Sequence, residues 1–85
     1  MNKSTLFEIL DTMATKASIC NDERPKYIDE NGNHKGNFRT FPIHSELKGM
    51  ELTLKIMGIE FGYEFNEDVT RITAIKSGDI RIEVR

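Results

Sequence analysis

Three side chains in this sequence are candidates for nucleophilic, acid–base or metal chemistry: Cys20, His34 and His44. A reactive cysteine needs a base that favours the thiolate, and none is adjacent to Cys20 in the sequence. The spacing of the three does not match that of structural zinc sites, and the motifs of nucleotide-binding loops, zinc proteases and serine hydrolases are absent. We therefore predict no catalytic residue, no metal and no cofactor, and an enzyme with a site near His44 is the least favoured alternative.

The segment from Asn31 to His44 has a composition that suits single-stranded nucleic acid. It combines basic and aromatic side chains with glycines and contains no Asp or Glu. Cations can neutralise phosphates, and aromatic rings can stack on bases. The candidate contacts for RNA or single-stranded DNA are His34, Lys35, Phe38, Arg39 and, further along the chain, Lys48. Because the positive charge is sparse, a solvated loop whose phenylalanines pack inward is the preferred interpretation.

A second group of polar residues follows the C-terminal third of the chain at alternating positions. Alternation places side chains on one face of a strand, and acidic and basic residues mix on this face. The candidate contacts for a partner protein are Glu60, Glu64, Arg71, Arg81, Glu83 and Arg85. A solvated sheet surface has the same composition, so both interpretations stay open.

Length and composition limit the scaffold that positions these residues. The chain has 85 residues, a net charge of −2 and one cysteine. This length predicts a single domain, residues 1–85, and the small charge indicates no class of partner. A lone cysteine fits a reducing compartment, and no apolar run approaches the roughly 20 residues that span a bilayer. We expect a cytoplasmic protein.

The N-terminal segment predicts an amphipathic helix. Thr5 and Glu8 have the spacing of a capping box, and apolar residues then recur at helical spacing from Leu6 to Ala17. The stretch from Cys20 to Pro25 is expected to end the helix in a turn. The apolar stripe is the natural cover for a sheet.

The stretch Met50–Ile56 alternates apolar and polar residues and predicts a β-strand. Met57-Gly58 then predicts a hairpin turn, and Ile59–Phe65 a second strand whose apolar residues all meet apolar residues of the first. The alternative is a helix, because Leu47, Met50, Leu54 and Met57 also have helical spacing. We prefer the strand since the helix leaves Leu52 and Ile56 unexplained.

The remainder of the chain predicts two further strands, residues 69–76 and 80–85, giving a four-stranded antiparallel meander over 50–85. The expected register pairs Phe65 with Thr70 and Ile82 with Ala74. An irregular hairpin from residues 26–43 is a further expected extension of the sheet. The last strand leaves an open edge, which invites pairing with a partner or with a second copy as a homodimer.

These observations predict an α+β fold, with an N-terminal helix packed on one face of an antiparallel sheet. The leading functional hypothesis is a non-enzymatic interaction protein that binds another protein as a regulator, inhibitor or adaptor. Small domains of this kind include proteins encoded by phages and mobile elements, which is a general expectation and not a property of these residues. The alternative is an RNA or single-stranded nucleic-acid binding protein that uses the Asn31–His44 segment.

Overall fold

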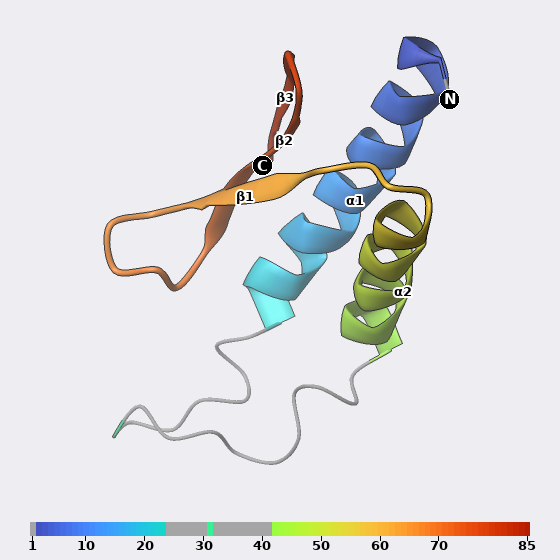
Figure 1. Cartoon of the computed structure of the whole chain (residues 1–85). Helices are drawn as coiled ribbons and strands as arrows, with labels where there is room; N and C mark the ends of the chain where they lie inside the picture. The colour runs from blue at the N-terminus through green and yellow to red at the C-terminus, as the bar shows by residue number, and fades with distance from the viewer. Residues whose placement is uncertain (1, 24–30, 32–41) are drawn as a thin grey trace.

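The computed structural model describes residues 2–23, 31 and 42–85, which form two helices and a three-stranded antiparallel sheet (Figure 1). In chain order the elements are α1 (Lys3–Glu23), α2 (Pro42–Ile56), β1 (Gly62–Phe65), β2 (Ile72–Ser77) and β3 (Ile80–Glu83). The predicted α+β class is confirmed. Within the described residues the sheet has three strands rather than the expected four. Of the predicted hairpin, residues 26–30 and 32–41 lie outside the described residues, residue 31 is in a turn, and the last two positions belong to α2.

Helix α1 begins earlier and ends later than its capping-box prediction. Asn2, not Thr5, is the N-terminal cap, because the Asn2 side-chain Oδ1 accepts a hydrogen bond from the Thr5 N–H at 2.8 Å. The helix continues beyond Ala17 to Glu23, and both Cys20 and Asn21 extend the buried stripe that the predicted turn was expected to interrupt.

The predicted strand Met50–Ile56 is wrong: these residues form the C-terminal half of α2. Pro42 occupies the first position of the helix, where a missing N–H costs nothing and the fixed φ is already helical. Leu47 and Leu54, two turns apart, are buried. The helical alternative, which rested on this spacing, is therefore the structure adopted.

Gly58 ends α2 and does not form a hairpin turn. It has a φ of +74°, its N–H donates to the Lys55 carbonyl at 3.0 Å, and the Ile59 N–H donates to the Leu54 carbonyl at 2.9 Å. These two bonds define a Schellman motif, in which a left-handed residue, usually glycine, closes the helix. Ile59 packs against the core cluster that contains Leu54, as this motif requires.

The β1–β2 connection places its strands in a different register from the predicted one. Phe65 pairs with Ile72 rather than Thr70, after a bulge at the end of β1. Asn66 organises the connection, because its side-chain Oδ1 accepts hydrogen bonds from the N–H groups of Thr70 and Arg71, both at 2.9 Å. These bonds hold residues 70 and 71 in the loop, so β2 begins only at Ile72.

The β2–β3 hairpin is confirmed in place but not in register. Its turn contains only Gly78 and Asp79, and Gly78 has a φ of +60°. Glycine in this conformation at the first position is typical of two-residue type II′ turns. Because the loop is shorter than expected, Ile82 pairs with Ile75 and not with Ala74.

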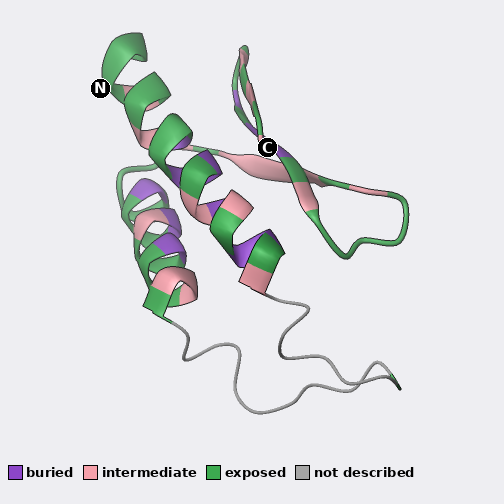
Figure 2. Cartoon of the chain, turned by 180° about the vertical axis from the view of Figure 1, so that it is seen from behind, coloured by how far each residue is buried: buried purple, intermediate pink, exposed green. Residues whose placement is uncertain are grey.

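The hydrophobic core gathers residues of both helices and β2. Helix α1 contacts α2, β2 and β3, and buried residues lie on the sides of α1 and α2 that face the other elements (Figure 2). The buried cluster consists of Leu10, Met13, Ala14, Ala17, Cys20, Leu47, Leu54 and Ile75.

Asn21 connects α1 to β2 through its side-chain amide. The Asn21 Nδ2 donates to the Ile72 carbonyl at 2.8 Å, and the Ile72 N–H donates to the Asn21 Oδ1 at 2.9 Å. Asn21 is buried. Its amide therefore satisfies both the N–H and the carbonyl of Ile72, the first residue of β2.

Candidate functional site

The outer face of α2 carries large apolar side chains in solvent. Leu52 and Ile56 are 58% and 78% exposed, and they lie one turn apart on the same side of the helix. Met57, which follows the helix, is 50% exposed. Gly49, one turn before Leu52, has open space where a Cβ would stand. We call Gly49, Leu52, Ile56 and Met57 the α2 surface.

Two polar side chains near the α2 surface, Lys48 and Thr53, are engaged within the helix. Lys48 forms an ion pair with Glu51, with 3.4 Å between Nζ and Oε1, and the Thr53 hydroxyl donates to the Gly49 carbonyl at 2.9 Å. Leu52, Ile56 and Met57 are thus the large apolar side chains that this part of the chain presents to a partner, beside the exposed Lys55. Exposed contiguous apolar groups of this kind typically mark protein–protein contact sites.

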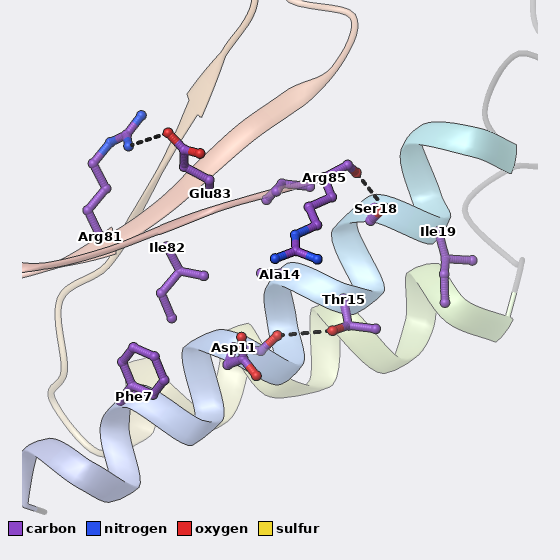
Figure 3. Close-up of a pocket in the computed structure, with 11 residues that line it drawn as sticks. Phe7, Asp11, Ala14, Thr15, Ser18, Ile19, Arg81, Ile82, Glu83 and Arg85 are labelled. Carbon is purple, nitrogen blue, oxygen red and sulfur yellow. Dashed lines mark hydrogen bonds and ion pairs between the residues drawn. The ribbon is translucent and has the colours of Figure 1, made fainter.

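A groove lies between α1 and β3 (Figure 3). It has a volume of about 770 Å³, and the side chain of Arg85 extends into it toward α1. The Ser18 hydroxyl donates to the Arg85 carbonyl and joins the end of the chain to α1. Phe7 and Ile19 line the groove from α1 and are about half exposed. The groove is open and lined by both apolar and charged groups, with no cluster suited to bond-breaking chemistry.

The structure brings together three of the predicted partner-binding residues. Arg81 donates from Nε to the Glu64 Oε2 at 2.8 Å, and its Nη1 lies 3.4 Å from the Glu83 Oε1. The hydrogen bond from Arg81 lowers the pKa of the Glu64 carboxyl below its ordinary value of 4.5. Arg81 offsets one of the two carboxylate charges on the exposed face of the sheet, so much of the charge in this cluster is already paired internally.

The other three predicted partner-binding residues lie apart from this cluster. Arg71 lies 3.8 Å from Asp22 at the end of α1, and Arg85 lines the groove. Glu60 precedes β1, and its carbonyl accepts a hydrogen bond from the Ser77 hydroxyl at 2.6 Å. The six residues therefore do not form one continuous surface around a single contact.

Of the residues predicted to bind nucleic acid, only Lys48 lies in the described part of the chain, where it is paired with Glu51. His34, Lys35, Phe38 and Arg39 lie outside the described residues. His44, which the sequence left as the remotest catalytic candidate, is half-buried in the first turn of α2. The nucleic-acid hypothesis therefore stays a prediction.

The interior contains three titratable groups close to one another: Cys20, Glu51 and Tyr63. Burial raises the pKa of the Cys20 thiol, and the Glu51 carboxylate raises it further. The same two causes raise the pKa of the Tyr63 hydroxyl. Both groups are therefore held in their neutral, protonated forms at pH 7, which is the opposite of what a nucleophile or a thiolate ligand needs.

Within the described residues, no three His, Cys, Asp or Glu side chains gather closely enough to hold a metal ion. Neither α1 nor α2 has the combination of length and apolarity that would carry a helix across a membrane.

The α2 surface was not predicted, although the sequence contains the signal for it. Leu52 and Ile56 were the residues that a helix left unexplained, and they were used as evidence for a strand. In a helix, apolar residues that fall outside the buried stripe must face solvent or a partner. Their exposure in the structure makes them the strongest candidate contacts in the described chain.

Comparison with known proteins gave no relationship from which a function can be transferred: no protein-family model, curated protein or solved structure matches this chain.

Proposed function

We propose that this chain is a non-enzymatic interaction protein that binds another protein through the α2 surface, as a regulator, inhibitor or adaptor. The observation that carries the proposal is the exposure of Leu52, Ile56 and Met57 together at one end of a helix whose opposite face is in the core. Full burial of an aliphatic side chain stabilises a contact by about 1.5–3 kcal/mol relative to exposure. Burying these residues under a partner is therefore worth a substantial part of a binding free energy.

The packing of the chain supports this assignment. We take α1 to be the cover of the apolar face of the sheet, and its contacts with β2 and β3 support that role. The inner side of α2 packs against α1, which leaves the outer side of α2 for a partner.

The partner that fits the α2 surface is a protein with an apolar groove or helix. An exposed stripe at positions i, i+3 and i+7, here Gly49, Leu52 and Ile56, is the pattern by which a helix docks into such a groove. Gly49 lets a partner approach the backbone closely, because no side chain occupies the space beside it.

Replacement of Leu52 and Ile56 by Asp tests the proposal. We expect the double variant to lose a protein that the wild type recovers from native cells, as measured by quantitative mass spectrometry of tagged captures. Both side chains are exposed, so the change in folding stability should stay within about 1 kcal/mol. The control is Val69→Asp, because Val69 is 59% exposed in the β1–β2 loop and the change replaces an exposed aliphatic side chain by the same acidic group outside α2.

The outcomes separate the candidate functions. A protein retained by the wild type and by Val69→Asp, but lost with the double variant, supports docking through α2. Equal recovery of all proteins by the double variant would rule out the α2 surface. Recovery of RNA, or loss of the captured protein after nuclease treatment, would instead favour the nucleic-acid alternative through the Asn31–His44 segment.

A further inference from the structure

The outer edge of β3 presents backbone hydrogen-bonding groups away from the sheet. The first pair after a two-residue turn is hydrogen-bonded, and such pairs then alternate along an antiparallel ladder. Ser77 and Ile80 form that first pair. The alternation continues to the end of the strand, because the Val84 N–H donates to the Thr73 carbonyl at 2.9 Å. The intervening Arg81 and Glu83 must therefore direct their N–H and C=O groups outward.

This edge lacks a partner within the described chain. β3 is the last strand of the sheet and pairs only with β2. The outward N–H and C=O groups of Arg81 and Glu83 form no hydrogen bond with any described residue. A row of unpaired groups of this kind is a template for one more strand.

The charges along this edge are complementary to themselves, and this identifies the occupant. We propose that β3 pairs antiparallel with β3 of a second copy of this chain, around a two-fold axis at Ile82. In this arrangement each residue faces the one equally distant from Ile82 on the other side. Arg81 of one copy then faces Glu83 of the other, and Glu83 faces Arg81. Opposite charges placed directly across two strands stabilise their pairing.

Neighbouring registers lack this complementarity. An axis at Glu83 would place Glu83 opposite Glu83. An axis at Arg81 would place Arg81 opposite Arg81. Like charges in these positions oppose pairing, and of the axes within β3 only the one at Ile82 makes Arg81 and Glu83 face each other. In that register Arg81 and Glu83 exchange both of their outward backbone bonds with the second copy.

The other face of β3 gains apolar contacts in the same arrangement. Ile82 points into the groove toward Phe7 of α1 (Figure 3), and Phe7 is 50% exposed. Ile82 of the second copy lies beside Ile82 on the same face and next to Phe7. The dimer therefore covers an aromatic side chain that the isolated chain leaves half in solvent.

Charge exchange tests the register, with the mass in solution measured by analytical ultracentrifugation at low salt. We expect the wild type to sediment at twice its chain mass of 9.8 kDa. Arg81→Glu and Glu83→Arg each place like charges across the interface and should sediment as monomers. An equimolar mixture of these two variants restores every opposite pair and should recover the double mass.

The control separates the interface from the internal ion pair of Arg81. Glu64→Gln removes the bond between Arg81 and Glu64 but leaves the β3 edge unchanged, so it should remain dimeric. A monomeric wild type would overturn the proposal, and so would single variants that stay dimeric. Loss of the dimer in the Leu52→Asp/Ile56→Asp variant, with the charge variants unaffected, would assign self-association to α2 instead.

Cysteine cross-linking locates the axis independently. In a Cys20→Ser background, Ile82→Cys places two thiols opposite each other at the axis, where oxidation should form an intermolecular disulfide. Ile80→Cys is the matched control, because residue 80 faces residue 84 of the second copy and should not cross-link. Equal cross-linking of both variants would exclude this register. The surface is separate from α2, so this proposal and the proposed function fail independently.

Discussion

Asn21 is the residue whose side chain does most to hold α1 and β2 together. Replacement by Ala would leave the N–H and C=O of Ile72 without the two bonds that they now make to the amide. Unpaired buried polar groups cost about 1–3 kcal/mol. We expect Asn21→Ala to reduce the free energy of unfolding by about 2 kcal/mol, measured by urea denaturation.

Asp22→Ala is the matched control for Asn21, because Asp22 is exposed and makes only a 3.8 Å ion pair with Arg71. A change within about 0.5 kcal/mol is expected for such a surface residue. If Asn21→Ala were as mild as Asp22→Ala, the amide bonds would not be what stabilises this junction. The sequence analysis assigned Asn21 to a turn, since a polar residue on an apolar stripe reveals its buried partner only in the folded structure.

At the scale of single elements, two glycines of α2 and its C-terminal end should respond oppositely to replacement by alanine: one substitution should lower the stability of the fold and the other should raise it. Gly58 has a φ of +74°, and a Cβ added there meets nothing within 4 Å. The cost of Gly58→Ala is therefore conformational, about 1–2 kcal/mol. Gly49 is inside the helix and is equally open, so Gly49→Ala should stabilise by up to about 1 kcal/mol.

Thermal unfolding followed by circular dichroism measures both changes. We expect the melting temperature to fall for Gly58→Ala and to rise for Gly49→Ala, by about 4–8 °C per kcal/mol for a chain of this size. A stabilising Gly58→Ala would show that the left-handed helix end is not required. The comparison is internal, because the two substitutions add the same methyl group in equally open surroundings.

The elements that the local sequence specifies by itself could be predicted, and those that tertiary contacts decide could not. The C-terminal hairpin was found because its turn residues and its alternation agree. The α2 segment was misassigned because Leu52 and Ile56 create strand-like alternation while lying outside the helix's buried stripe. Gly58 fits both a hairpin and a helix end, and the contact of Ile59 with the core, which decides between them, is not visible in the sequence.

At the scale of the whole molecule, four shifted titrations determine how stability depends on pH. Hydrogen bonds from Arg81 and Lys3 lower the pKa of Glu64 and of Asp79. Their contribution is present above the ordinary values of 4.5 and 3.8 and is lost as the pH falls through the lowered values. Both carboxylates are exposed, so solvent screening keeps this acid effect small.

The alkaline effect has the opposite sign and comes from the interior. Cys20 and Tyr63 have raised pKa values, so the folded chain retains protons that the unfolded chain releases above about pH 9. We expect the urea midpoint to be level near neutral pH and to fall more steeply above pH 9 than below pH 5. Tyr63→Phe should flatten the alkaline fall, whereas a profile parallel to the wild type would remove Tyr63 as its cause.

The position of Cys20 also gives the molecule a built-in kinetic reporter. Its thiol lies in the last turns of α1, only 6% exposed, and burial keeps it protonated. A thiol reagent can reach it only during moments when this part of the helix separates from its neighbours. The rate at which the native chain is labelled therefore reports how often the junction between α1 and the sheet opens, without any engineered probe.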